Sequence, residues 1–147
     1  MNVKRRLKGS GVILAALMTA LASCSKPIDH CKVMIVTLQQ SVKPDVLRQA
    51  AADLVAKYPT GAAHRLSTDE MPDAVMKVML SLRLEEAVVC KEVFSGRRIL
   101  LMDSPGGFAS YGVKVAPPET YLDLATNVHG LTELQWKDGI LVFYFIQ

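Results

Sequence analysis

Three cysteines and three histidines are the side chains of this sequence with the greatest potential for chemistry. A protein metal site needs several ligands at suitable spacing, such as two histidines one helical turn apart. His30, His64 and His129 stand far apart, and none has a second ligand three or four residues away on a predicted helix. We therefore expect no metal site and interpret the histidines as surface or capping residues.

The candidate nucleophiles Cys90 and Ser104 lack the local signatures of catalytic residues. Ser104 precedes a proline and two glycines, but the G-x-S-x-G elbow is missing from the sequence, as are phosphate-binding glycine patterns. A hydrolase would need His64 or His129 within about 3.2 Å of one of these nucleophiles in the folded chain. We therefore predict a non-catalytic protein, with an envelope hydrolase as an alternative.

Cys24 ends a segment with the layout of a secretory signal peptide. The first eight residues carry four positive charges, and residues 9–23 carry none. The apolar stretch Val12–Ala22 is shorter than the roughly 20 residues that a helix needs to cross a bilayer. We therefore expect residues 1–23 to be removed as a signal rather than to anchor the protein.

Leu21–Cys24, with the sequence LASC, resembles the lipobox of bacterial lipoproteins. The resemblance implies cleavage between Ser23 and Cys24, with a diacylglycerol thioether on Cys24 and commonly an N-acyl chain such as palmitate. Two or three acyl chains hold a protein firmly at a membrane, whereas one binds only marginally. Ser25, rather than aspartate, follows the cysteine, which in such lipoproteins implies the periplasmic face of the outer membrane. The resemblance covers residues 1–24 alone.

Removal of the signal changes the net charge of the chain. Four of the 17 basic residues lie in the signal, so 13 remain against 14 acidic residues, a formal charge of −1. Proteins that bind nucleic acids carry a basic patch or stripe, so no nucleic-acid partner is expected. We expect a membrane contact through the lipid and a protein partner in the envelope. No small-molecule substrate is indicated, and no cofactor beyond the lipid on Cys24.

Cys31 and Cys90 remain as an even pair in a compartment that favours disulfides. A bridge between them would close a loop of about 59 residues and stabilise the fold by roughly 4 kcal/mol in the chain-entropy account. We predict this disulfide. The alternative is a pair of buried apolar thiols.

The first half of the chain after the signal predicts one strand and two helices within a single domain. Residues 24–30 are expected to form a short tether, and residues 31–147 the domain. Lys32–Leu38 is rich in β-branched residues and has apolar residues at both odd and even positions, which favours a strand covered on both faces. Pro44–Tyr58 has apolar residues at helical spacing, and a capping box at Ser67 and Glu70 predicts a helix that runs to about Leu84.

The second half of the chain is rich in strand signals. Ala87–Asp103 predicts a hairpin, although its first part could instead prolong the preceding helix. A further strand is expected at 108–116 and a short helix between residues 117 and 130. Asp138-Gly139 between apolar runs predicts a final hairpin. The predicted fold is therefore α+β: a mostly antiparallel sheet with two longer helices and one short helix.

The final strand has apolar residues at both odd and even positions, so both of its faces need to be covered, by helices or by a partner. We interpret Phe143, Tyr144 and Phe145 as candidate partner-binding residues. The predicted function is a lipid-anchored accessory subunit of a secretion or surface-assembly system, similar in size and plan to small lipoprotein pilotins. The alternative is a periplasmic immunity or inhibitor lipoprotein that neutralises a toxin or hydrolase.

The lipoprotein assignment can be tested at Cys24. Mass spectrometry of the protein from its native cells is expected to find acyl chains on an amino-terminal Cys24. The Cys24→Ala variant should carry none, because it lacks the sulfur that forms the thioether, whereas Ser25→Ala should stay acylated. An intact, unacylated amino terminus on the wild-type protein would contradict the assignment.

Overall fold

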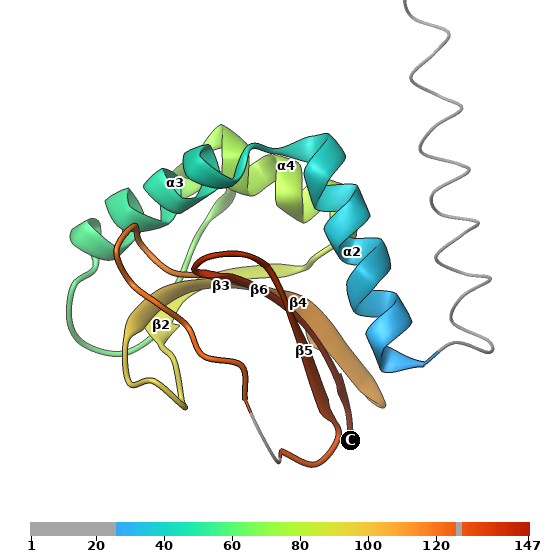
Figure 1. The fold of residues 1–147 in the computed structure, drawn as a ribbon. Helices are drawn as coiled ribbons and strands as arrows, with labels where there is room; N and C mark the ends of the chain where they lie inside the picture. Colours follow the sequence, from blue (N-terminus) through green and yellow to red (C-terminus); the bar gives the residue numbers. More distant parts are fainter. Residues whose placement is uncertain (1–25, 126–127) are drawn as a thin grey trace, which may run out of the picture.

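Three α-helices pack on one face of a six-stranded antiparallel sheet (Figure 1). The computed structural model describes residues 26–125 and 128–147. Its helices and one 3-10 turn are α2 Pro27–Ser41, α3 Pro44–Lys57, η2 Thr68–Glu70 and α4 Asp73–Leu82. Its strands are β1 His64–Arg65, β2 Glu86–Lys91, β3 Arg98–Ser104, β4 Ala109–Val115, β5 Leu131–Lys137 and β6 Ile140–Ile146. The predicted α+β class is confirmed, with the strand order β1-β2-β3-β4-β6-β5.

The segment predicted as a buried strand, Lys32–Leu38, is the middle of helix α2. The strand prediction is therefore wrong. Buried residues such as Met34 and Leu38 recur at helical spacing, so one face of α2 packs inward while the other is exposed. Burial of that face outweighs the strand preference of the β-branched residues between them. Residues 27–30, which were assigned to the tether, form the first turn of this helix.

The helix predicted at Pro44 is confirmed as α3, whereas α4 begins later than predicted. The capping box of Ser67 and Glu70 is present, but it belongs to the 3-10 turn η2. α4 starts directly after Pro72, because a proline disfavours helical geometry in the residue before it. Arg83 adopts a left-handed conformation with φ of 54° and ends α4.

Both predicted hairpins are confirmed. β2 and β3 pair from Lys91 opposite Arg98 to Glu86 opposite Asp103. β5 and β6 are joined by a turn in which Gly139 has φ of 74°, a conformation that favours glycine. The further strand predicted after the first hairpin is β4, which pairs with both β3 and β6. As a result β6 lies inside the sheet, between β4 and β5.

The chain between β4 and β5 crosses the sheet without the predicted short helix. Residues 117–125 are non-helical, as are residues 128–130, so the prediction is wrong for the described part of this segment. Arg48 of α3 donates hydrogen bonds of 2.6–3.3 Å to three carbonyl oxygens in residues 116–120. A side chain thus binds carbonyls that a helix would have paired internally. Leu122 is buried against the sheet, which holds the crossing segment in place.

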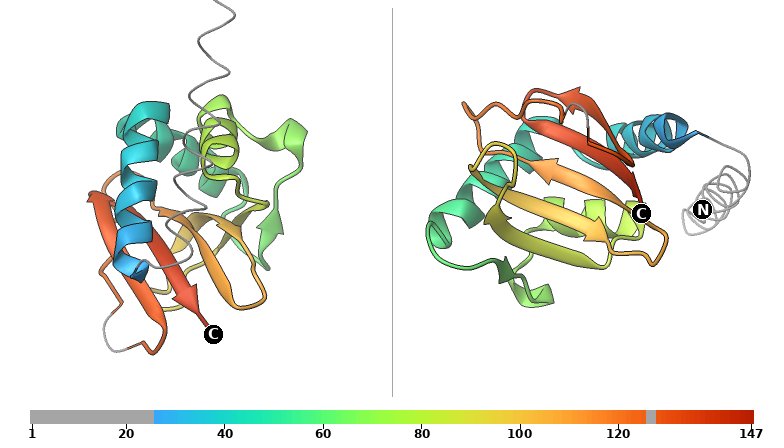
Figure 2. Two further views of the ribbon diagram at one scale, coloured as in Figure 1. Left: turned by 90° about the vertical axis from the view of Figure 1, so that its right-hand side faces the viewer. Right: turned by 90° about the horizontal axis from the view of Figure 1, so that it is seen from below.

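The sheet has an apolar cluster on each face. The helices bury the larger cluster, which includes Leu100, Val113 and Val142. The smaller one lies on the opposite face, which Figure 2 shows in the view from below, and consists of Ile99, Ala116, Leu122 and Leu141. Because β6 contributes Val142 to one cluster and Leu141 to the other, it is covered on both faces, as predicted.

The predicted disulfide between Cys31 and Cys90 is not formed, since both residues are free cysteines. Cys31 is fully buried on α2 within the helix-side cluster. Cys90 on β2 packs against the cluster on the other face, because its neighbour Val89 points toward the helices and side chains alternate along a strand. The sheet therefore separates the two thiols. Burial raises the pKa of Cys31 to about 11, so this thiol is protonated at neutral pH.

Candidate functional site

The predicted lipidation and cleavage residues, Cys24 and Ser23, lie outside the described residues. The first turn of α2 begins at Pro27, three positions after the predicted lipid-bearing cysteine. Across residues 26–125 and 128–147, no helix is both long enough and apolar enough to span a membrane.

The aromatic residues predicted to bind a partner lie on β6, an interior strand. Phe143 is 7% exposed, and the ring of Tyr144 stacks on His30 of α2 with centroids 4.5 Å apart. Phe145 is half-buried. Since β4 and β5 occupy both edges of β6, this strand offers a partner no free backbone, and these side chains contribute mainly to the fold.

The candidate hydrolase residues contact side chains that do not form a nucleophile–histidine pair. Ser104 Oγ lies 3.1 Å from Glu85 Oε1, and His64 Nε2 lies 3.1 Å from Glu70 Oε1. Cys90 packs in the apolar cluster on the open face of the sheet, and burial raises the pKa of its thiol. Among the described residues, no group of three or more histidine, cysteine, aspartate or glutamate side chains is arranged to hold a metal ion.

Glu70 is the centre of a polar cluster that closes the connection between α3 and β1. It accepts a hydrogen bond from Tyr58 Oη, and its other oxygen accepts one from the Ser67 backbone N–H at 2.8 Å. The His64 ring stacks on Tyr58 with centroids 3.8 Å apart, and Lys57 lies 4.0 Å from the carboxylate. The bonds from Tyr58 and Ser67 hold the pKa of Glu70 at about 2. Each contact joins neighbouring segments of this chain, so we interpret the cluster as structural.

Lys114 forms a second polar cluster on the sheet face opposite the helices. Its ammonium lies 2.6 Å from Glu133 and 3.1 Å from Glu92, and all three side chains are largely buried. Glu133 also accepts a hydrogen bond from the N–H of Ala125 in the crossing segment. Glu92 accepts one from the N–H of Ser95 in the β2–β3 turn. The cluster therefore ties a turn and a crossing segment to the sheet.

Two carboxylates around one ammonium leave no free cation for a ligand in this cluster. Burial alone raises the pKa of Glu92, but the hydrogen bonds from Ser95 and the Lys114 ammonium outweigh it and lower the pKa overall. Glu92 is therefore ionised and engaged at neutral pH. We interpret this cluster, like that of Glu70, as part of the fold.

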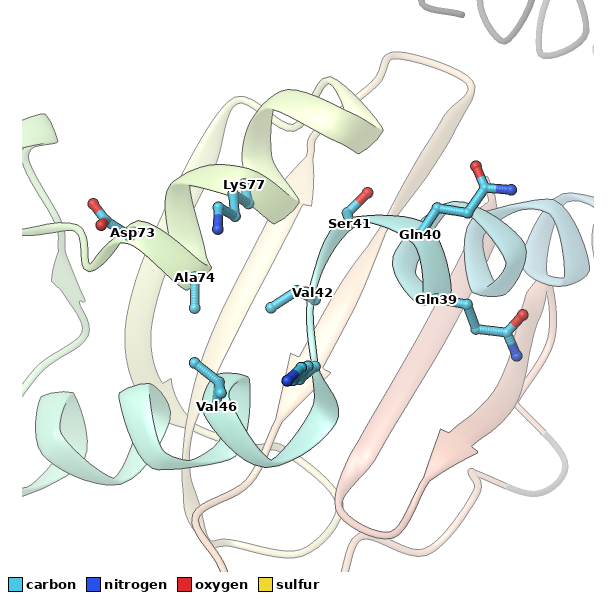
Figure 3. A pocket seen from close by; sticks show the side chains of 9 residues that line it. Gln39, Gln40, Ser41, Val42, Val46, Asp73, Ala74 and Lys77 are labelled. Atoms are coloured by element: carbon cyan, nitrogen blue, oxygen red, sulfur yellow. The ribbon is translucent and has the colours of Figure 1, made fainter.

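The candidate site is a groove of about 460 Å³ where the three helices meet (Figure 3). Its apolar floor consists of Val42, Val46 and Ala74, whose side chains point into the space between the connection α2–α3 and the helices α3 and α4. Val46 is 52% exposed, so part of this floor is open to solvent. Polar side chains form the rim: Gln39, Gln40, Ser41, Lys43, Asp73 and Lys77.

A second groove of about 480 Å³ adjoins the first one and shares Val46, Asp73 and Ala74 with it. Its rim is acidic, because it adds Asp45 and Asp53 of α3. The first groove instead has two lysines on its rim. We call the two together the helix groove. Its shared middle contains Val46 and Ala74 beside Asp73, whereas one end adds two lysines and the other adds two aspartates, which suits a ligand with the opposite order of charges.

The residues that line the helix groove come together only when the chain folds. Its lining comes from the end of α2, the start of α3 and the start of α4. The sequence does not predict this groove, because a strand at Lys32–Leu38 would remove the wall that α2 forms. The available signal was Pro27 followed by buried residues every three or four positions.

Comparisons with protein-family models, with curated proteins and with solved structures found no match for this chain. The helix groove is a concave surface whose lining combines apolar residues with a charged rim, a combination typical of binding sites.

The Glu70 cluster predicts a specific dependence of stability on pH. A carboxylate whose pKa falls from 4.5 to about 2 on folding stabilises the protein above pH 4.5, and this contribution is lost as the pH falls toward 2. Glu70→Gln is therefore expected to lower the free energy of unfolding at pH 7, and its difference from wild type should shrink between pH 4.5 and 2. Urea denaturation at a series of pH values measures this. Asp69→Asn, in the same turn, is the control and should change stability little.

The Lys114 cluster predicts a large loss of stability when its cation is removed. Lys114→Met leaves two buried carboxylates without a counter-charge, which typically costs about 3–5 kcal/mol. Urea denaturation at pH 7 should show this loss, whereas Lys91→Met, at an exposed position of β2, should change the free energy of unfolding little. Adding Glu133→Gln to Lys114→Met should restore part of the loss. Equal stabilities of Lys114→Met and wild type would argue against the role of the cluster.

Proposed function

We propose that this protein is a lipid-anchored bacterial envelope protein that binds a segment of a partner protein in the helix groove. It acts without catalysis, as an accessory subunit of a secretion or surface-assembly system. The anchor is supported by the signal layout and LASC motif at Leu21–Cys24. The single observation that carries binding is the exposed apolar floor of the groove around Val46, bounded by charged rims.

The position of the groove on the molecule suits an anchored binding protein. The predicted lipid at Cys24 lies three residues before the first turn of α2, and the groove begins at the last turn of the same helix. A helix of 15 residues is about 22 Å long. With the start of α2 near the bilayer, the groove opens well away from the lipid, where a periplasmic partner can reach it.

The chemistry of the groove describes its partner. Lys43 and Lys77 at one end favour acidic residues, and Asp45 and Asp53 at the other favour basic residues. The floor around Val46 accepts a small apolar side chain between them. We therefore propose a peptide segment with an acidic residue, an apolar residue and a basic residue in this order along the groove.

Lipid anchoring adds to the affinity of such a site. A groove of this size that binds one short segment gives modest affinity on its own. Confinement of both proteins to the same membrane raises their effective concentration, so a modest site is sufficient for stable assembly. This physical advantage favours an accessory subunit whose partners lie at the membrane.

The proposal predicts site-specific crosslinking in native cells. A photocrosslinking amino acid at position 46 should give a discrete adduct with an envelope protein, and one at position 36 should not. Val36 is the matched control, because it is also a half-exposed valine on a helix, 49% against 52%, and does not line the groove. Adding Lys77→Glu should reduce the adduct at position 46 by about tenfold, which corresponds to about 1.4 kcal/mol.

Two results would count against this function. Equal crosslinking at positions 36 and 46 would remove the groove as the binding site. An adduct with a toxin or a cell-wall hydrolase would favour the immunity or inhibitor function over an accessory subunit.

A further inference from the structure

One end of the domain gathers the start of α2 with the end of the sheet. His30 in the first turn of α2 stacks on Tyr144 of β6. In the next position, Cys31 Sγ lies 3.8 Å from the carbonyl oxygen of Thr132 in β5. The start of α2 is therefore fixed beside the beginning of β5 and the end of β6. Figures 1 and 2 show this arrangement from three directions.

The β3–β4 turn belongs to the same end of the molecule. Ala109 at the start of β4 pairs with Ile146 at the end of β6, and the N–H of Gln147 donates to the carbonyl oxygen of Phe108 at 3.1 Å. Phe108 is 90% exposed and Ile146 is 44% exposed. Phe108, directly before β4, and Ile146, at the end of β6, are thus exposed apolar residues at the same end of the sheet.

This end of the domain is almost without charge. Ser104–Val113, which includes the β3–β4 turn, contains no charged side chain, and neither does Ile140–Gln147. Such a surface loses little when it leaves water, because it has no ionised side chains to desolvate. Charged side chains border these segments: the Glu85 carboxylate lies 3.1 Å from Ser104 Oγ, and at the start of α2 Lys26 precedes the helix and Asp29 pairs with Lys32 at 3.9 Å.

The predicted lipid anchor brings this surface to the bilayer. Pro27 lies three positions after Cys24, and a fully extended chain spans at most about 10 Å over three residue steps. The start of α2 therefore stays within this distance of the lipid, and the surface around Phe108 is fixed beside it. The predicted anchor therefore makes the bilayer the expected partner of this surface.

We infer that the end of the sheet that exposes Phe108 and Ile146 is a membrane-contact site that inserts into the interface of the bilayer carrying the lipid on Cys24. This inference rests on the proposed anchoring. The apolar side chains enter the boundary between headgroups and acyl chains, where apolar residues of peripheral proteins are buried. Lys26 lies at headgroup level and suits anionic lipids. The contact orients the domain with α2 pointing away from the membrane and the helix groove at its far end.

The experiment introduces tryptophan as a reporter of contact with lipid. The mature lipoprotein with Phe108→Trp is reconstituted into phosphatidylethanolamine–phosphatidylglycerol vesicles whose acyl chains carry bromine, which quenches nearby tryptophan. The control is Val93→Trp, because Val93 is 88% exposed and lies in the turn at the opposite end of β3, a strand about 20 Å long. The wild-type protein gives the background from Trp136, its sole tryptophan.

The expected result is quenching of the Phe108→Trp protein by about twofold or more, with little quenching of the Val93→Trp protein. Ile146→Trp serves as a second reporter and should behave as Phe108→Trp does. Flotation of the vesicles separates the two proposals. If the protein floats with the vesicles but the tryptophan at position 108 is not quenched, the membrane contact is overturned and the anchor stands. A blue shift of the tryptophan emission without quenching has the same meaning, because it indicates a protein neighbour rather than lipid. Protein that does not float overturns the anchoring, and the orientation with it.

Discussion

The burial of β6 on both faces is the constraint on which the rest of the structure depends. The residues of β6 are mainly apolar on both faces of the strand. Exposing either face to water would therefore cost much of the free energy of folding. The helices cover Ile140 and Val142 on one face. The crossing segment covers Leu141 on the other with Leu122. Arg48 joins the two layers, because it extends from α3 to the carbonyls at the start of that segment.

The open face of the sheet depends on charge as well as on apolar contact. The segment after β4 has no helical hydrogen bonds in residues 117–125, so side chains must hold it. Glu133 does so through the N–H of Ala125 and is itself neutralised by Lys114. Lys114 also lies 5.1 Å from the ring of Phe94, which keeps the β2–β3 turn over the same face. Removing water from these ions is costly, and their mutual pairing makes the arrangement stable.

The two ends of α2 have different chemistry, and this difference gives the molecule a direction. Near Pro27 the neighbouring end of the sheet exposes Phe108 and Ile146, which lie in segments without charged side chains. Near Ser41 the surface is a groove with charged rims. A lipid at one end and a binding groove at the other would let a small domain meet the membrane and a partner at once. The rigid helix between them sets the distance, which a flexible tether would leave free.

Much of the fold follows from local patterns in the sequence, whereas the candidate site does not. The predicted signal segment, helix α3 and the turn at Gly139 each depend on residues close together in the chain, so they can be predicted from the sequence alone, and the structure confirms α3 and the turn. The groove around Val46 could not be predicted in this way, because three separate elements supply its lining. The strands that flank β6 are set by contacts between distant segments, so the sequence alone does not show that Phe143–Phe145 lie on an interior strand.

Tertiary structure decided the remaining features. Lys32–Leu38 contains apolar residues that satisfy both strand and helix periodicity, and only packing of Met34 and Leu38 against the sheet selects the helix. Cys31 and Cys90 are separated because the sheet lies between them, a fact that their spacing in the chain does not contain. Local conformational preferences act between near neighbours in sequence, whereas burial depends on contacts between distant segments. In this domain burial outweighs the local preferences.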